Sequence, residues 1–276
     1  MSAAVCRSEH QRATGSLRVA IKRRGPASVL ADLHQEGCLK ARFPRPVDWA
    51  EVVSLNSSGG VVGGDRLEWD FSVEAGARAV FASQAAERFY RALPDDPPAH
   101  LRTHIAVAEG AAAEWLPQET ILFDRAALDR VLDVEMAADG WFLGVESLVF
   151  GRTAMGETVA TARLADTIRV RRDGRLLLHD AVRLTGAVAE TLGGAAVARG
   201  GAAVATLVHV ARDAEASLDR LRAAFADTPA EAGASVWDGM LVGRIVAQDG
   251  ARLRATVIAA LSVLRAGRAL PRVWQC

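Results

Sequence analysis

The stretch Arg66-Leu-Glu-Trp-Asp-Phe-Ser-Val-Glu74 decides the fold, because its side chains alternate strictly between apolar and polar. One face carries Leu67, Trp69, Phe71 and Val73, and the other is charged or hydroxylated. A period of two sustained over this length predicts a strand with one buried face. Ala75-Gly76 then turns the chain, and residues 77–82 are expected to return as a second strand.

The same strand–glycine–strand pattern recurs, with turn glycines at positions 76, 110, 140 and 174. Successive glycines are therefore 34, 30 and 34 residues apart. Repeats of this length are typical of solenoids, although an irregular β-sandwich with long hairpins would give a similar pattern. We predict a mainly β fold over about residues 15–210, built of stacked strand–turn–strand layers that are β-solenoid-like or form an irregular sandwich.

The last quarter of the chain changes character. A helix is expected after Asp213, which would serve as its N-cap, with Leu218, Leu221 and Phe225 on one face. A loop at residues 229–233, a short hairpin at 236–246 and a second helix at 251–265 follow. These two C-terminal helices form an α+β part over about residues 211–270. Residues 1–276 contain no long linker, so we expect a single domain, with an exposed proline-rich loop at residues 94–98.

Composition excludes several classes of function. The chain has 276 residues, 33 basic and 33 acidic side chains, and a formal net charge of zero. It lacks the sequence-wide positive charge with which proteins hold nucleic acid or an anionic membrane, so we expect neither partner. Lysine occurs only at positions 22 and 40, and no G-x-x-x-x-G-K-S/T motif occurs. Nucleotide hydrolysis by a P-loop is therefore excluded.

The cysteines and the chain ends predict a cytoplasmic protein. Cys6, Cys38 and Cys276 are odd in number and far apart, so a disulfide framework is not expected. The first residues lack the apolar core of a signal peptide. The apolar run at residues 255–264 is too short to cross a bilayer.

Two local patterns resemble binding sites. Gly59-Gly-Val-Val-Gly-Gly64 could cradle an anion, but a strand follows it where a phosphate loop would lead into a helix. A tight turn that needs positive φ angles is the favoured interpretation. His100 and His104 have the spacing of a helical metal pair. In a strand, which the alternation around them predicts, they lie about 13 Å apart, at about 3.3 Å per residue, so a shared metal site is not expected and two polar residues on the solvated face are the favoured interpretation.

Carboxylates in apolar surroundings are the remaining candidates. Glu114, Glu119 and Asp124 flank a mostly apolar stretch, and Glu146 follows another. Such groups must be paired, protonated or bound to metal. They are hydrogen-bonded structural residues, a line of oxygen ligands, or an acid/base pair as in glycosidases, and the sequence leaves these alternatives open. No G-x-S-x-G motif surrounds Ser57, Ser58 or Ser83, so a serine hydrolase is not supported.

Several of these stretches together resemble the urease accessory protein UreD (UreH) family. The resemblance rests on Gly59-Gly-Val-Val-Gly-Gly-Asp65, Phe89-Tyr-Arg91, Glu114-Trp-Leu-Pro-Gln-Glu-Thr120 and the ending Pro271-Arg-Val-Trp274. Two loops depart from the family pattern: Asn56-Ser57-Ser58 stands for His-Pro-Pro, and Glu87-Arg88 stands for a Thr-Lys-like pair. The family-motif residues are Gly59, Gly60, Gly63, Gly64, Gln84, Tyr90, Arg91, Pro117, Gln118, Thr120, Gly144 and Arg152.

The resemblance implies a non-enzymatic assembly factor, largely of β structure, that binds UreF, recruits the GTPase UreG and helps to insert nickel into apo-urease. It implies no tightly bound cofactor, transient nickel only, and GTP only through the partner. Because nickel in transit needs weak, exchangeable ligands, we expect a path of four carboxylates: Asp65, Glu114, Glu119 and Glu146. The alternatives are a β-layered hydrolase with paired carboxylates, and a protein-binding scaffold that never contacts metal.

Overall fold

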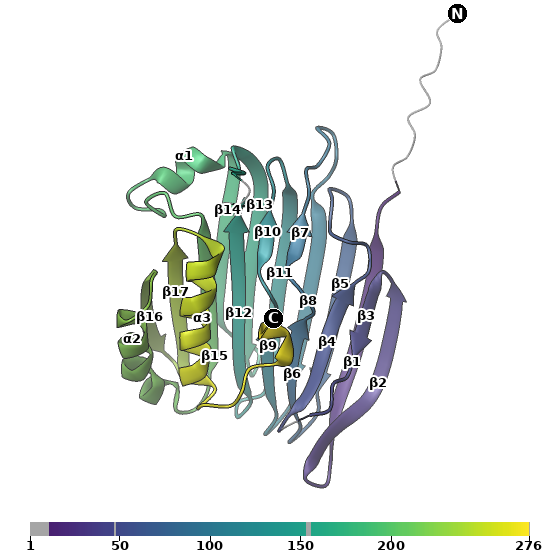
Figure 1. Cartoon of the computed structure of the whole chain (residues 1–276). Coiled ribbons are helices and arrows are strands. Elements are labelled where there is room, and N and C mark those ends of the chain that lie inside the picture. The colour runs from purple at the N-terminus through teal and green to yellow at the C-terminus, as the bar shows by residue number, and fades with distance from the viewer. Residues whose placement is uncertain (1–10, 47, 153–155, 276) are drawn as a thin grey trace, which may run out of the picture.

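The computed structural model of the chain describes residues 11–46, 48–152 and 156–275; Cys6 and Cys276 lie outside them. Two β-sheets are stacked face to face, and the helices lie mainly at one end and on the outer face of the second sheet (Figure 1). The first sheet consists, in spatial order, of β14 (Arg175–Ala187), β13 (Thr161–Arg172), β11 (Ala127–Met136), β8 (Ala99–Val107), β5 (Arg66–Val73), β1 (Thr14–Arg24) and β2 (Ala27–Gly37).

The second sheet is longer and carries the C-terminal part of the chain. Its order is β16 (Glu231–Trp237), β17 (Met240–Ala247), β15 (Ala203–Val210), β12 (Trp141–Phe150), β9 (Ala112–Leu116), β6 (Arg78–Ser83), β4 (Ala50–Asn56) and β3 (Leu39–Arg42). Two short strands, β7 (Glu87–Phe89) and β10 (Thr120–Leu122), pair with each other, and β10 also pairs with β12.

Successive repeats stack as parallel strands, which confirms the mainly β, layered fold. Each repeat places one strand in the first sheet and the next in the second. Arg66 of β5 pairs with His100 of β8, and Arg78 of β6 pairs with Ala112 of β9, so both sheets share an offset of 34 residues. Repeated turns at one end of the stack return the chain from one sheet to the other, as expected of Gly76 and Gly110, which have φ angles of 66° and 62°.

The fourth glycine turn behaves differently from the expectation. Asp173 and Gly174 have φ angles of 53° and 74°, and the chain reverses there into an antiparallel hairpin between β13 and β14 within the first sheet. Two residues with positive φ form the tight turn that suits a hairpin and is too short for a crossover between sheets. The regular layering therefore ends at β13.

The period-two pattern correctly predicts which side chains fill the space between the sheets. Leu67, Phe71 and Val73 are buried there, and Phe71 stacks on Phe81 of the opposite sheet with ring centroids 4.3 Å apart. A second apolar cluster lies between the outer face of the second sheet and helix α3 (Gly250–Leu264), which buries Leu253, Val257, Ala260, Leu261 and Leu264 as predicted.

Three details of the C-terminal part differ from the sequence prediction. Asp213 makes no capping hydrogen bond through its side chain, and a 3₁₀ turn (Ala214–Ser217) precedes α2 (Leu218–Ala226). The expected loop at 229–233 already contains the start of β16, because the hairpin is longer than predicted. Two short elements complete the description: α1 (Val188–Gly193) and a C-terminal 3₁₀ turn (Arg272–Trp274).

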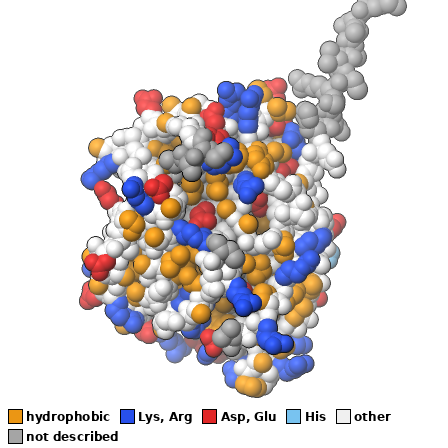
Figure 2. Space-filling model, viewed as in Figure 1, with side chains coloured by type: hydrophobic (Ala, Val, Ile, Leu, Met, Phe, Trp, Pro, Cys, Tyr) orange, Lys and Arg blue, Asp and Glu red, His pale blue; other side chains and the backbone are white. Residues whose placement is uncertain are grey.

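The surface agrees with the balanced charge of the chain. On the face that carries α3, basic and acidic side chains are interspersed with hydrophobic ones (Figure 2). Among the described residues, no helix is both long and apolar enough to span a membrane.

Candidate functional site

The glycine-rich segment is a turn that packs against Tyr90. Gly59, Gly60 and Gly64 have positive φ angles of 82°, 140° and 87°, which confirms the turn interpretation. A Cβ atom on Gly60 would lie 2.3 Å from Cε2 of Tyr90, and the Tyr90 hydroxyl donates a hydrogen bond to the carbonyl of Gly59. The absent side chain thus allows the ring to lie against the backbone.

Asp65 closes this turn. Its carboxylate is buried, and its two oxygens accept hydrogen bonds of 2.8 Å from the backbone N–H groups of Val62 and Ala13. Both interactions hold the turn and the start of the first strand in place. The geometry of Asp65 is therefore that of a structural carboxylate.

Glu114 is buried on the helix side of the second sheet. Its carboxylate lies 3.0 Å from Nε of Arg265 and 2.8 Å from Nη2 of Arg268, which follow the end of α3. The side chain of Glu114 is fully inaccessible and that of Arg265 is 4% exposed. This ion-pair cluster joins α3 to the central strand β9.

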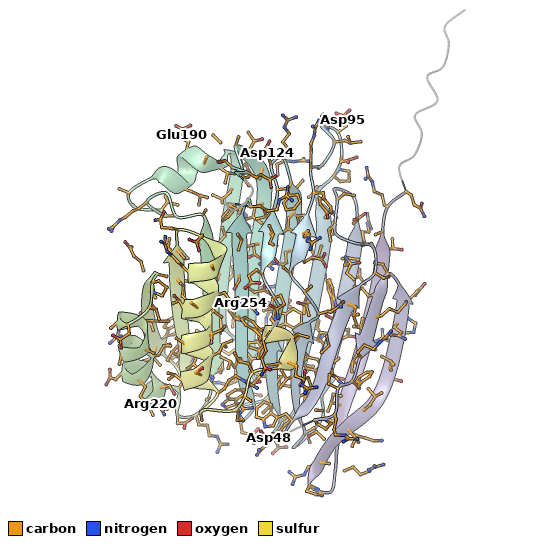
Figure 3. The ribbon with its side chains drawn as sticks, viewed as in Figure 1. Asp48, Asp95, Asp124, Glu190, Arg220 and Arg254 are labelled. Atoms are coloured by element: carbon orange, nitrogen blue, oxygen red, sulfur yellow. The ribbon has the colours of Figure 1, made fainter. Side chains whose placement is uncertain are left out.

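Glu119 and Gln118 hold the C-terminal turn. Arg254 of α3 donates to Glu119 at 2.9 Å and to the side-chain oxygen of Gln118 at 2.6 Å. Arg254 also donates to the carbonyl of Trp274, and the amide of Gln118 donates to the carbonyl of Val273. In Figure 3, Arg254 lies between α3 and the C-terminal turn. Glu119 thus faces the outside of the second sheet.

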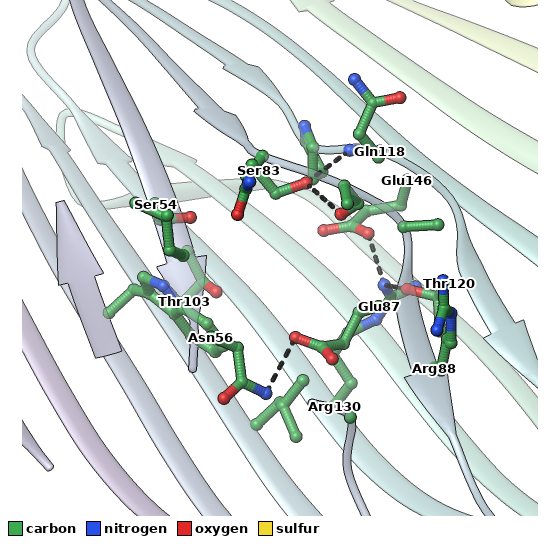
Figure 4. A pocket seen from close by; sticks show the side chains of 18 of the residues that line it. Ser54, Asn56, Ser83, Glu87, Arg88, Thr103, Gln118, Thr120, Arg130 and Glu146 are labelled. Carbon is green, nitrogen blue, oxygen red and sulfur yellow. Dashed lines mark hydrogen bonds and ion pairs between the residues drawn. The ribbon is translucent and has the colours of Figure 1, made fainter. Parts of the chain in front are cut away.

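A cavity of about 230 Å³ lies between the two sheets. The first sheet contributes Trp69, Thr103 and Arg130 to its lining, and the second contributes Trp115 and Glu146. The turn glycines 59 and 60, Glu87 and Gln118 also line it (Figure 4). Of the four carboxylates that the sequence predicts for a path, Glu146 is the one among the lining residues; Asp65, Glu114 and Glu119 lie elsewhere, so the structure does not bring the four together.

Glu146 is part of a buried ionic cluster centred on Arg130. Nη1 of Arg130 lies 2.6 Å from Glu146 and donates to the Thr120 hydroxyl at 2.8 Å. Nε and Nη2 donate to both oxygens of Asp166 at 2.8 and 2.7 Å. The indole N–H of Trp115 donates to the other oxygen of Glu146 at 2.7 Å. Each carboxylate oxygen of Glu146 therefore has a partner.

Burial and the neighbouring charges act on this cluster in opposite directions. Burial and the charge of Asp166 raise the pKa of Glu146, while Arg130 and the Trp115 hydrogen bond oppose that rise. Burial disfavours the charged form of Arg130, but Asp166 and Glu146 outweigh it and raise the pKa of the guanidinium. We conclude that Arg130 is cationic and that it neutralises one of the two carboxylates it contacts.

A second cavity of about 210 Å³ lies on the other side of this cluster. Glu146 and Asp166 line it, together with Asp180 and Arg244, whose charged groups are 2.6 Å apart. Strands β12, β13, β14, β15 and β17, together with α1 and the segment after it, form its walls. Because Glu146 lines both cavities, the Arg130 cluster is the partition between them.

Glu87 and Asn56 face each other at the rim of the first cavity (Figure 4). The Asn56 amide donates to the Glu87 carboxylate at 3.2 Å. Burial raises the pKa of Glu87 to about 7, and the Asn56 hydrogen bond opposes the rise. Asn56 ends β4 and Glu87 begins β7, and both belong to the segments that depart from the expected family pattern, so the two departures contact each other.

The comparison with known proteins decides the family. A sequence model described as the UreD urease accessory protein matches residues 13–275. The chain belongs to the UreD family of urease accessory proteins. It is 46% identical to the urease accessory protein UreD of Dinoroseobacter shibae over 96% of this chain and 93% of that protein. It is 44% identical to UreD of Sinorhizobium medicae over 96% of both chains, and 42% identical to UreD of Rhizobium leguminosarum bv. trifolii over 99% of both.

Some of the remaining motif residues lie at the first cavity, and the others pack elsewhere in the two sheets and their loops. Gln84 and Pro117 line it, and Thr120 accepts the hydrogen bond from Arg130. Tyr90 packs edge-on against Phe123, above whose ring Arg152 lies. Gly63 approaches the carbonyl of Pro97, and a Cβ on Gly144 would meet the ring of Phe142 at 2.7 Å. Arg91 is exposed, at an isolated bridge to Ala126.

Each histidine of the pair contacts a carboxylate of its own. His100 and His104 both lie on β8 as predicted, and each faces a different carboxylate: His100 lies 3.4 Å from Asp129, and His104 lies 3.1 Å from Asp70. Among the residues that the structure describes, no group of three or more His, Cys, Asp or Glu side chains is placed to hold a metal ion.

Sequence reasoning missed Arg130, Asp166 and Glu87. Arg130 lies on the buried face of β11, between the apolar residues Leu128 and Leu132. Asp166 lies in the same way on the buried face of β13, between Leu164 and Ile168. A charged residue at the buried phase of a period-two strand is the signal that could have revealed both. Glu87 lies in a strand of three residues, where no such period can be recognised.

Proposed function

We propose that this chain is a non-enzymatic assembly factor for urease, which binds UreF, through it positions the GTPase UreG, and helps to insert nickel into the apo-enzyme. Membership of the UreD family supports a role in urease maturation. The sequence has no P-loop, so GTP would be bound and hydrolysed by the partner. We propose a cytoplasmic location, with neither nucleic acid nor membrane as a partner.

We further propose that the space between the sheets carries nickel in transit. The observation that carries this step is the pair of cavities that share the buried carboxylate of Glu146. Carboxylate oxygens bind divalent nickel less tightly than a cage of histidine and cysteine, so a cation can leave as readily as it enters. Glu87 at the rim of the first cavity and Asp180 in the second extend the series of oxygen ligands on either side of Glu146.

The role of Asp65, Glu114 and Glu119 is better explained by structure than by metal transfer. Each has its carboxylate engaged by backbone N–H groups or by arginine, outside the set of residues that line the cavities. The proposed path therefore retains Glu146 from the four carboxylates that the sequence suggested.

A glycosidase-like activity is less well supported. Its two carboxyl groups need different tasks, one as an acid and one as a free carboxylate. Here Glu146 and Asp166, which both line the second cavity, share one arginine and are held in ion pairs with it. Neither group is free to accept a substrate atom without first losing Arg130.

The test is complementation of urease maturation. Cells that carry every other urease gene but lack this one should make urease with little activity and little bound nickel. Restoring this chain from a plasmid should restore both the specific activity and the nickel content per urease. Fully active, nickel-replete urease in cells without this chain would overturn the proposed function.

A further inference from the structure

The partition between the two cavities contains more charge than the fold needs. Two carboxylates, Glu146 and Asp166, enclose the guanidinium of Arg130, and the side chains of all three are at most 9% exposed. Burying such ions is costly, and replacing a buried ionic cluster by apolar residues of similar volume is often neutral or stabilising. Stability alone therefore does not explain why this cluster lies within an otherwise apolar core.

The arrangement of donors suggests what the cluster does. Arg130 contacts Asp166 through both oxygens but contacts Glu146 through one, sharing that Nη1 with the Thr120 hydroxyl. The pair with Glu146 is therefore the weaker attachment. Glu146 is also the residue that both cavities reach. A cation that moves from one cavity to the other by way of Glu146 meets the atoms that Arg130 occupies.

We propose that Arg130 is a gate between the two cavities, an inference that rests on the proposed passage of nickel. Its guanidinium occupies the position at which Glu146 and Asp166 would hold a divalent cation. A cation that enters from the first cavity displaces Nη1 from Glu146, and the return of Arg130 to Glu146 releases the cation into the second. The passage then conducts divalent ions without storing them, because the internal positive charge competes for the oxygen ligands.

The second cavity repeats this arrangement. Asp180 pairs with Arg244 at 2.6 Å, and Arg244 donates to the Thr206 hydroxyl at 2.8 Å, as Arg130 does to Thr120. The arginine in this case is half exposed, with 48% of its side chain accessible, so the pair lies toward the surface. In each cluster, an arginine pairs with a carboxylate and also donates to a threonine hydroxyl.

The test removes the gate and measures metal binding by the isolated chain. Arg130→Met should bind one more Ni²⁺ per chain than the wild type in equilibrium dialysis, and Ni²⁺ should raise its melting temperature more than that of the wild type. Both effects should disappear in Arg130→Met/Glu146→Gln. The matched control is Arg169→Met, which removes an arginine that pairs with Asp133 between the same two strands on the opposite face.

Further variants distinguish a folding defect of Arg130→Met from a failure of the gate proposal. Removing Arg130 leaves two buried carboxylates unpaired, so Arg130→Met should be less stable than the wild type without metal. Ni²⁺ should restore its folding, and the neutral variant Arg130→Met/Glu146→Gln/Asp166→Asn should fold without metal. A response to Ni²⁺ equal to that of the wild type, in the folded or the unfolded Arg130→Met chain, would overturn the inference. Because the measurement needs no urease, its failure is distinct from a failure of the complementation experiment.

Discussion

The ion pairs of Glu114 provide a quantitative test of its structural role. Glu114→Gln keeps the volume of the side chain but removes its charge, which leaves Arg265, 4% exposed, without its carboxylate. Breaking a buried pair from one side costs about 3–5 kcal/mol. Arg265 retains hydrogen bonds to the carbonyls of Arg268 and Ala269, so we expect the lower end, about 3 kcal/mol. That is a large share of a stability of about 5–15 kcal/mol that is typical of folded proteins.

The assay is urea-induced unfolding followed by circular dichroism, with the wild-type slope used for both proteins. Glu231→Gln is the matched control, because Glu231 pairs with Arg199 at the surface with both side chains about 70% exposed. A pair of that kind contributes less than about 1 kcal/mol. If Glu114→Gln lowers the free energy of unfolding no more than Glu231→Gln does, the Glu114 carboxylate is not structural. Excluding Glu114 from the proposed nickel path would then be unjustified.

Three further predictions address the rim of the first cavity, the glycine turn and the C-terminal turn. The raised pKa of Glu87, about 7, means that the folded chain holds a proton there that the unfolded chain loses above about 4.5, so this site destabilises the fold as the pH rises through that window. The free energy of unfolding of Glu87→Gln should therefore exceed that of the wild type by up to about 3 kcal/mol at pH 8 and equal it at pH 4.5. Equal stability of the two proteins at both pH values would contradict the burial of Glu87. Gly60→Ala should cost about 1–3 kcal/mol more in urea unfolding than Gly59→Ala, whose added methyl group meets no atom; equal costs would show that the turn relaxes freely. Trp274→Ala should cost about 3–5 kcal/mol and speed proteolysis of the C-terminal segment, whereas Trp237→Ala, at an exposed site, should do neither; similar digestion of both variants would show that Trp274 does not anchor the C-terminal turn.

The strand pattern was predictable because burial on one face leaves a direct trace in the sequence. Residues 66–74 alternate as β5 does in the structure, and the spacing of Gly76 and Gly110 matches the offset between stacked parallel strands. The hairpin at Gly174 was not predictable from the glycine alone, since both kinds of turn use a positive φ angle. What distinguishes them is the partner of the following strand, which is a tertiary property.

The candidate site was only partly predictable. Glu146 could be selected because it follows an apolar segment, but Glu114 also lies beside one. The sequence does not show that Arg265, far along the chain, neutralises Glu114. Arg130 and Asp166 are 36 residues apart and meet because β11 and β13 pair in parallel. Such a contact depends on strand register, which local patterns do not contain.

The most direct measurement of the central claim is the nickel content of urease when the first cavity is filled. Thr103 is buried in its wall, so Thr103→Phe should obstruct the space between the sheets. Thr167→Phe adds the same ring on the outward side of β13 and serves as the control. In cells that depend on the plasmid-borne chain, we expect Thr103→Phe to fold and to retain UreF in pull-down assays while urease lacks nickel and activity, and Thr167→Phe to behave as the wild type. Fully nickel-loaded urease with a folded Thr103→Phe chain would contradict transfer through this cavity and favour a scaffold that never contacts the metal.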